Sequence, residues 1–488
     1  MLNTISECIP YREDNAPVIG MIMATLSGEF DKKLKEEVQA RYRKMFDSFI
    51  EQKIINKKSL FFASCYGENE VIDACDKMTT NRVDGIIYHS LTWPAAETVT
   101  TLATYRYLKD IPILVSASPE VFSEKKNKPH IWPLNSDCGK IFANSIFYKL
   151  RRPTLWATGL PEDETYQRKL LDFFTVSQLV RRVREAKLVV IGNIMDDFPE
   201  SFYNPLTVRR ELGIRVVEID SSVLFTLFED GEYPARGLKI NQNEIQEEID
   251  RIKNQLEVKV NDKTLIDATK AYLAYKEIIK HTGAEGAVFR CAPEWQEKYN
   301  LVICGVISEL IDNGIIYSGG CEGDVYNTLT GLVQFYASGY PTACLDWIDK
   351  PGASGRGRYT LLHCGNACKG MLIPGRGVVD YHQVWLENQV GYTIEGPIKK
   401  GNVTLSRLRE NRDGQLELLI VEANSVTDEM EIRGNYGVVE IGEERLKRLE
   451  YELNENGWPH HLSLGWGHHG GILKKASKFL GKIKVVSI

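Results

Sequence analysis

The sequence has the composition of an ordinary globular protein. It has 488 residues, of which 43% are hydrophobic and 26% charged, enough apolar material for two to four domains. A net charge of -6 excludes a general basic field for nucleic acid, and the apolar runs are too short to span a bilayer. Residues 1–14 lack the apolar stretch of a secretory signal, and ten scattered cysteines indicate reduced thiols. We therefore expect a cytoplasmic protein that binds neither nucleic acid nor membrane.

The first part of the chain, residues 1–160, alternates apolar runs with amphipathic segments. We expect strands at 17–25, 59–65, 84–89 and 111–116, and helices at 30–50, 69–78, 95–108 and 138–150. Such alternation is typical of βαβ units with a parallel sheet. Functional groups then gather at the carboxyl ends of the strands.

The same alternation continues over residues 161–345, and residues 346–488 differ in character. In the second part we expect strands at 187–192, 214–219, 314–318 and 342–345, and helices at 161–186, 243–256, 264–281, 295–311 and 325–337. The third part has short strands with turn signals between 359 and 441, then helices at 443–454 and 472–480. The predicted fold class is α/β, with two parallel-sheet, Rossmann-like domains followed by a mainly β C-terminal domain.

Two carboxylates are the first candidates for chemistry. Glu322 lies in a glycine-rich turn before the expected helix 325–337, and Asp346 follows the next expected strand. In a right-handed βαβ unit, both positions fall at one sheet edge, where neighbouring strands lie about 4.8 Å apart. The pair could therefore share a divalent cation. Alternatively, Glu322 caps the helix and Asp346 is an ordinary loop carboxylate.

Histidines supply a second group of candidates. Four of the nine histidines, His460, His461, His468 and His469, lie within ten residues. Imidazole is a common ligand of divalent metals, although a solvated loop would also explain the cluster. His363 ends an apolar strand, from which its ring could reach the same sheet edge.

Other features are weaker. Trp93 follows the third expected strand, where it could offer an aromatic platform to a sugar or simply pack inside its own domain. Cys364 and Cys368 lack the second cysteine pair of a structural zinc site. Arg356 and Arg358 could hold an anionic group, although a solvated loop explains them equally. No Gly-x-Gly-x-x-Gly fingerprint follows the first strand, which disfavours a nicotinamide cofactor.

The carboxylates and the final histidines resemble the L-fucose isomerase/L-arabinose isomerase family. Glu322 and Asp346 stand at the same separation as the paired metal-binding carboxylates of L-fucose isomerases. In that family, the ligand histidine of the C-terminal stretch precedes a second histidine by seven residues, as His461 precedes His468 in HLSLGWGHHGG. The step from Asp346 to His363 instead resembles L-arabinose isomerases, whose length is also closer to that of this chain.

The resemblance implies a metal-dependent aldose–ketose isomerase that works through an enediolate. It implies Glu322 and Asp346 as metal ligands and acid/base pair, and His461 as the third ligand. It makes His363 a candidate fourth ligand and places His460 beside the substrate. Mostly oxygen ligation with one imidazole suits Mn²⁺, with Co²⁺ or Mg²⁺ as other candidates. The expected substrate is a pentose, a 6-deoxyhexose or a related sugar that carries a sulfonate or phosphate.

The resemblance also implies an oligomer. Members of the family assemble as trimers or hexamers in which the first domain of one subunit covers the site of the next. Trp93 of a neighbouring subunit would then contact the substrate. Two alternatives stay open at this point: a metal-dependent hydrolase or aldolase that acts on a sugar derivative, and a sugar-binding protein without turnover.

Overall fold

The computed structural model describes residues 16–26, 32–119, 134–349, 357–427, 430 and 432–488. These residues form two compact units. The smaller contains the described residues up to Arg182 together with Lys474–Leu480, and the larger contains Val183–Leu473 and Gly481–Ile488. Residues 1–14, the first two positions of the expected helix 30–50, and Arg356 lie outside the described residues. Within the described parts of the chain, none of the helices combines the length and apolar character that crossing a bilayer requires.

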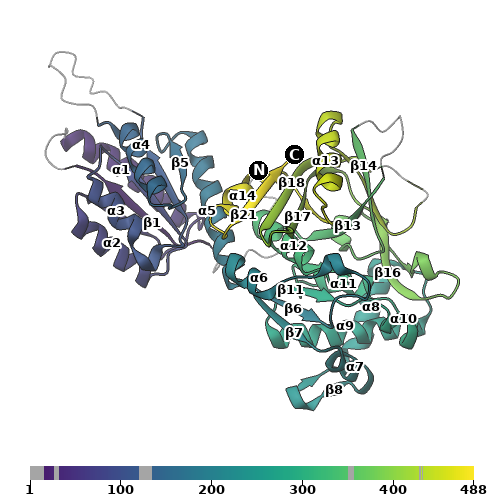
Figure 1. Ribbon diagram of the computed structural model, residues 1–488. Helices are drawn as coiled ribbons and strands as arrows, with labels where there is room; N and C mark the ends of the chain where they lie inside the picture. Colours follow the sequence, from purple (N-terminus) through teal and green to yellow (C-terminus); the bar gives the residue numbers. More distant parts are fainter. Residues whose placement is uncertain (1–15, 27–31, 120–133, 350–356, 428–429, 431) are drawn as a thin grey trace. The chain divides into compact units, whose positions relative to one another are not determined.

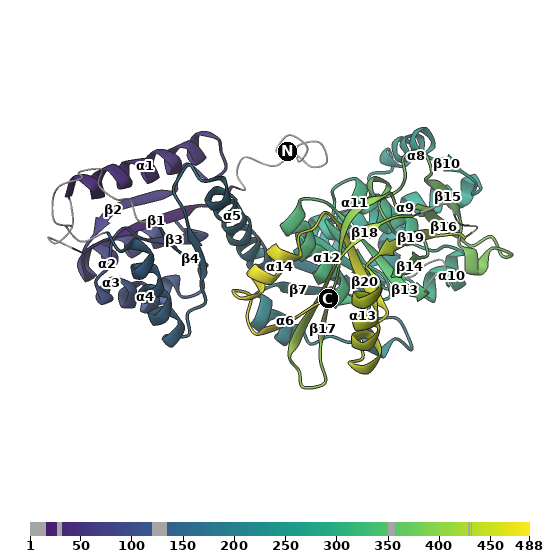
Figure 2. The ribbon, with the colours of Figure 1, turned by 90° about the horizontal axis from the view of Figure 1, so that it is seen from above.

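The smaller unit is built around a parallel sheet with strand order β2-β1-β3-β4-β5. Its strands are β1 (Ile19–Ala24), β2 (Leu60–Cys65), β3 (Gly85–Ser90), β4 (Ile113–Ala117) and β5 (Leu155–Thr158). Its helices are α1 (Lys32–Glu51), α2 (Glu68–Thr80), α3 (Ala96–Thr104), η2 (Arg106–Leu108), α4 (Ser136–Lys149) and α5 (Glu164–Glu185), which leads into the larger unit. Helix α1 covers one face of the sheet, and α2, α3 and α4 cover the other (Figure 2). Cover on both faces explains why β1 is apolar and buried along its whole length.

The larger unit begins with a second parallel sheet, in the order β12-β11-β6-β7. Its strands are β6 (Lys187–Ile191), β7 (Arg215–Ile219), β11 (Gly286–Phe289) and β12 (Ser318–Gly320). The helices of this region are η3 (Pro199–Ser201), α6 (Pro205–Leu212), α7 (Ser221–Asp230), α8 (Glu244–Gln255), α9 (Asp262–Thr282), α10 (Glu294–Tyr299), α11 (Cys304–Asp312) and α12 (Val325–Ser338). A small ribbon beside α7 consists of β8 (Glu232–Tyr233), η4 (Pro234–Arg236) and β9 (Leu238–Lys239).

The rest of the larger unit is a ten-stranded, mainly antiparallel sheet in the order β10-β15-β16-β19-β14-β13-β20-β17-β18-β21. Figure 1 labels β13, β14, β16, β17, β18 and β21 of this sheet. Its strands are β10 (Glu257–Val258), β13 (Thr342–Asp349), β14 (Arg358–His363), β15 (Val378–Tyr381), β16 (Gly391–Pro397), β17 (Gly401–Glu410), β18 (Leu416–Ser425), β19 (Asn435–Glu440), β20 (His461–Trp466) and β21 (Ile483–Ser487). The accompanying helices are η6 (Lys369–Met371), η7 (Gln383–Trp385), α13 (Glu443–Glu455) and α14 (Gly470–Ser477), which belongs to the smaller unit from Lys474 onward. Two parallel sheets and a mainly β C-terminal sheet confirm the predicted fold class.

Helix α12 joins the two sheets of the larger unit. It contacts β11 and β12 of the parallel sheet and β13, β17 and β20 of the ten-stranded sheet. Twelve of its fourteen residues are buried, as expected for a helix with sheets on two sides. The turn before α12 and the ends of β13 and β20 are therefore held in fixed relation.

This arrangement corrects one expectation. The sequence suggested that the strands before and after α12 are neighbours in one parallel sheet. Instead, β13 lies between β14 and β20 in the ten-stranded sheet. Helix α12 carries the chain from one sheet to the other, so the proximity of Glu322 and Asp346 depends on packing between sheets.

Two other helical expectations also need correction. The expected helix 295–311 is two helices, because Asn300 adopts a left-handed conformation with φ 52° and ends α10. Leu301 then forms a β-bridge with Gly391, which stops the helix from continuing. Helices α6 and α7 are absent from the expectations, although the side chains of Asn204 and Asp220 cap them.

Candidate active site

Glu322 lies in the loop between β12 and α12. It adopts a left-handed conformation with φ 57°, and Gly323 follows with φ 75°. A Cβ at Gly323 would lie 2.3 Å from the Ile194 Cα, so this turn requires glycine. Helix α12 is capped by Asp324, whose side chain accepts a hydrogen bond from the Asn327 N–H. The alternative that Glu322 caps the helix is therefore wrong.

The other predicted ligands come from three neighbouring strands. Asp346 on β13 stands directly opposite His461 on β20 and Leu362 on β14. Residues directly opposite each other in an antiparallel pair lie about 5 Å apart on the same face of the sheet. His363 follows Leu362 at the end of β14, and its ring centroid lies 5.4 Å from that of His461. The sheet register thus brings Asp346 and His461 together, and the contact between the two rings places His363 beside His461.

Bare polar atoms converge where these strands meet the Glu322 loop. The Nε2 of His461 lies 3.3 Å from Glu322 Oε2 and 3.5 Å from Asp346 Oδ1. All three atoms are buried and have no hydrogen-bond partner. Buried polar atoms normally have partners, so an unsatisfied group of two carboxylate oxygens and one imidazole nitrogen fits a divalent cation. These are the three residues that the resemblance named as ligands.

A buried ion pair decides which nitrogen of His461 faces this group. The Nδ1 of His461 bonds to Asp324 Oδ2 at 2.9 Å, and Arg407 Nη1 donates to the same oxygen at 2.6 Å. Burial would raise the pKa of Asp324, but Arg407 and His461 hold it below its usual range. Because Asp324 stays ionised, it accepts a hydrogen bond from the Nδ1–H of His461, and the Nε2 lone pair is left free for a metal. Sequence reasoning missed Asp324 and Arg407, since an Asp before a helix signals only a cap.

His363 has the opposite tautomer. Its Nδ1 accepts a hydrogen bond from the Cys364 N–H at 2.8 Å, so a neutral ring carries its proton on Nε2. That Nε2 is buried without a partner. A metal ligand needs a lone pair at this position, whereas His363 presents a hydrogen-bond donor. This geometry does not favour His363 as the fourth ligand.

His460 lies at the more exposed side of the same group, with 40% of its side chain accessible. Its Nε2 is 3.6 Å from Glu322 Oε2 and 3.9 Å from Asp346 Oδ1, and its Nδ1 pairs with Glu200. The hydrogen bond to Glu200 is the main reason why the pKa of His460 rises to about 10. No motif marked Glu200, which comes from η3.

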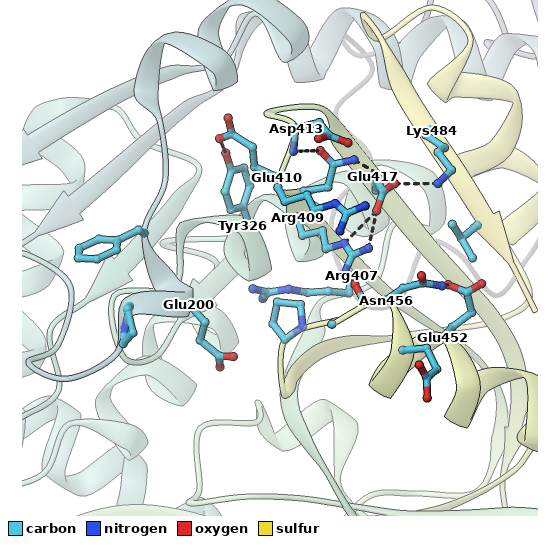
Figure 3. A pocket seen from close by; sticks show the side chains of 18 residues that line it. Glu200, Tyr326, Arg407, Arg409, Glu410, Asp413, Glu417, Glu452, Asn456 and Lys484 are labelled. Atoms are coloured by element: carbon cyan, nitrogen blue, oxygen red, sulfur yellow. Dashed lines mark hydrogen bonds and ion pairs between the residues drawn. The ribbon is translucent and has the colours of Figure 1, made fainter.

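A cavity of about 700 Å³ borders the groups that orient His460 and His461. Glu200, which pairs with His460, and Arg407, which pairs with Asp324, are among its lining residues (Figure 3). Three other charges of the lining are paired with one another, because Glu417 accepts from both Arg409 and Lys484. The cavity therefore lies beside the charged groups behind the predicted ligands.

The remaining candidates do not join this group. The Nε2 of His468 bonds to the Ala423 carbonyl, and that of His469 bonds to the Gln334 side chain. The guanidinium of Arg358 pairs with Glu440 at 3.4 Å. These contacts support local structure, and they account for three of the candidates without involving the ligands.

Trp93 belongs to the smaller unit, in the loop after β3. It is 40% exposed, and its ring centroid lies 5.3 Å from that of Phe142. It is therefore neither a core residue nor free of contacts within its own unit. Its predicted contact with a neighbouring subunit's substrate stays a prediction.

The sequence of the chain is similar to those of sulfoquinovose isomerases. Sulfoquinovose isomerase of Priestia aryabhattai is 22% identical over 396 residues, covering 80% of this chain and 83% of the relative. Sulfoquinovose isomerase of Alkalicoccus urumqiensis is 24% identical over 401 residues, covering 80% and 84%. No family model matches the chain.

Solved structures add little. A transporter solute-binding protein from Agrobacterium vitis with bound D-fucose aligns with 11% identity and a TM-score of 0.14, covering 62% of this chain and 82% of the other. A galactofuranose-binding protein aligns with 13% identity and a TM-score of 0.17, covering 67% and 90%. Scores this low carry no argument. The sequence relatives decide the identification: the chain is a homologue of sulfoquinovose isomerases and an aldose–ketose isomerase related to the L-fucose/L-arabinose isomerase family.

Proposed function

We propose that the chain interconverts sulfoquinovose, or a closely similar sulfonated aldose, and the corresponding ketose with the help of a divalent cation. The substrate is taken from the relatives, whose name states that they isomerise sulfoquinovose. The observation that carries the proposal is the convergence of unpartnered atoms of Glu322, Asp346 and His461 in a chain that aligns with these isomerases over four-fifths of its length.

Glu322, Asp346 and His461 would hold the cation, which we expect to be Mn²⁺. Two carboxylates and one imidazole form a mainly oxygen donor set, which suits Mn²⁺ better than thiolate-preferring metals. When bound, the cation would act as a Lewis acid for the oxygens on the two reacting carbons. Asp324 would keep the His461 ring in the tautomer that this role requires.

The same carboxylates would move the proton. Isomerisation of an aldose removes the proton from C2 and returns one to C1, with an enediolate between the two steps. A carboxylate next to both carbons can accept the proton and deliver it again. Glu322 approaches His461 Nε2 from the loop after β12, and Asp346 approaches it from β13 of the other sheet, so they can lie on either side of a bound sugar carbon pair.

Two further histidines would contact the substrate. The Nε2–H of His363 is a buried donor that suits a sugar oxygen. His460 is held by Glu200 at the exposed side of the ligand group and would donate to a second oxygen. Each ring is oriented by a hydrogen bond at its other nitrogen, which favours a fixed donor direction.

We also propose a cytoplasmic homotrimer or homohexamer in which Trp93 of a neighbouring subunit covers the sugar. Support comes from the surface of α4, where Ile141 is 62% and Tyr148 84% exposed seven residues apart on one helix face. Large apolar side chains exposed together often mark interfaces. Excluding water from the site would strengthen the electrostatic interactions within it.

The test is product analysis by ¹³C NMR with Mn²⁺ and sulfoquinovose, alongside D-glucose, L-fucose and L-arabinose. We expect a ketose of unchanged formula from sulfoquinovose and much slower turnover of the uncharged sugars. Fragments of the sugar would indicate an aldolase or hydrolase. Binding without any product in a metal-loaded sample would indicate a sugar-binding protein.

A further inference from the structure

A group of four cysteine thiols lies next to the candidate active site. The Sγ atoms of Cys304 and Cys364 and a ring nitrogen of His382 all lie within 4.8 Å of one another. Further inside, Cys321 Sγ lies 3.5 Å from Cys291 Sγ. Two of these thiols adjoin residues of the site: Cys321 precedes Glu322, and Cys364 follows His363.

The cysteines of this chain differ in access. Cys364 is half-buried, whereas Cys304, Cys321 and Cys291 are buried. Among these four thiols, a small oxidant from solvent therefore meets Cys364 first. The nearest thiol partner in the group that surrounds Cys364 is Cys304, the first residue of α11.

His382 argues against a metal in this cluster. Its Nδ1 accepts a hydrogen bond from the Val384 N–H at 3.1 Å, so a neutral ring carries its proton on Nε2. The ring then offers a donor to the sulfurs instead of a lone pair to a cation. A thiol pair beside an imidazole N–H is an arrangement that favours thiol chemistry over metal coordination.

We propose that Cys364 and Cys304 are a redox-sensitive pair that hydroperoxides oxidise to a disulfide, with loss of isomerase activity. The Cys364 thiolate attacks hydrogen peroxide; an S–O bond forms, the O–O bond breaks and hydroxide leaves, which gives a sulfenic acid. The Cys304 thiol gives up its proton and attacks that sulfur; an S–S bond forms and water leaves. Two thiols lose two electrons, and the peroxide is reduced to two waters.

Disulfide formation would disturb the adjacent site. An S–S bond is about 2.05 Å long, so the two sulfurs must approach each other, and we expect this movement to shift the backbone at Cys364. The Cys364 N–H fixes the ring of His363, and the next residue, Gly365, has φ 136° and is closely packed against Thr393. The shift would therefore change the direction of the His363 donor. Reduction by a dithiol would restore the backbone at Cys364 and the direction of the His363 donor.

The test uses the Mn²⁺-loaded full-length protein and hydrogen peroxide. Peptide mapping without reduction should reveal a Cys304–Cys364 linkage, and activity should fall at least tenfold and return with dithiothreitol. Cys304→Ser should form no linkage. In this variant the Cys364 sulfenic acid has no partner thiol, so excess peroxide should oxidise it further to the sulfinic acid, which dithiothreitol does not reduce. The matched control is Cys138→Ser, which removes the exposed cysteine of α4 and should behave like the wild type.

Several results would overturn the proposal. One is the absence of the linked peptide under conditions that modify Cys138. Another is a first linkage between Cys291 and Cys321. A third is a linkage that leaves activity unchanged. Stoichiometric zinc in protein purified with reductant, lost in Cys304→Ser, would make the cluster a metal site instead.

Discussion

The Nδ1 of His461 is bonded to the Oδ2 of Asp324 at 2.9 Å, and this contact selects the nitrogen that faces Glu322 and Asp346. Asp324 performs a second task with its other oxygen, which caps α12. One buried residue therefore couples the start of the helix between the sheets to the orientation of the predicted metal ligand.

Asp324→Asn should weaken Mn²⁺ binding about 10–100-fold, because an amide no longer favours the required tautomer of His461. Asparagine is also a good helix cap, so α12 should be retained. Isothermal titration calorimetry measures the affinity, and circular dichroism checks the fold. Asp220→Asn is the matched control, since it alters the capping aspartate of α7 without touching the site. Equal Mn²⁺ affinity in the two variants would contradict the role of Asp324.

Glu322→Gln and Asp346→Asn should each lower turnover by several orders of magnitude, because each removes a ligand charge and a base together. The NMR assay with sulfoquinovose measures this loss. Asp349→Asn, at the exposed end of the same β13 strand, should retain near-normal turnover. Reaction in D₂O should place deuterium next to the product carbonyl when the enediolate exchanges with solvent. Near-normal turnover in either site variant would remove the central assignment.

Prolonged chelation should abolish activity, and Mn²⁺ should restore it better than Zn²⁺, since the donor set is rich in oxygen. His461→Ala should weaken Mn²⁺ binding far more than His468→Ala. The reason is that His468 bonds to the Ala423 carbonyl outside the ligand group. Calorimetry on both variants makes the comparison, and the reverse order would move the ligand assignment to His468.

Mixing inactive subunits tests the shared site. If Trp93 covers the site of a neighbouring subunit, Trp93→Ala and Glu322→Gln protomers will combine into oligomers in which some sites carry neither change. Partial activity should then return after subunit exchange, which native mass spectrometry can verify. Continued inactivity after verified exchange, or a monomer with normal turnover, would rule out sharing.

His89 should make the smaller unit sensitive to acid. It is fully buried beside Ser116, and burial lowers its pKa to about 3. In the unfolded chain the pKa of this histidine is about 6.5. Below that pH the unfolded chain binds a proton that folded His89 does not bind, so the free energy of unfolding falls as the pH drops towards 3. The expected loss is about 1.4 kcal/mol per pH unit. Hydrogen exchange of β3 amides near pH 6 and near pH 5 measures it, and His89→Gln should show a clearly smaller dependence on pH. An unchanged dependence would contradict this account.

The sequence by itself was sufficient for the fold class and for the main ligand candidates. Apolar strands alternating with charged helices predict parallel sheets covered on both faces, as in β1 with α1 and α2. Glu322, Asp346 and His461 were found because their spacing matches a known family and their side chains suit a divalent cation. Local periodicity and residue chemistry carry this information directly.

Tertiary structure alone decided how those residues come together and which tautomers the histidines adopt. The pairing of β13 with β20 sets Asp346 opposite His461, although 115 positions separate them in the sequence. The tautomers of His461 and His363 depend on Asp324 and on the Cys364 N–H, contacts that exist only after α12 and β14 are in place. Such contacts between distant segments leave no periodic or local trace, because they arise when two sheets pack against one helix.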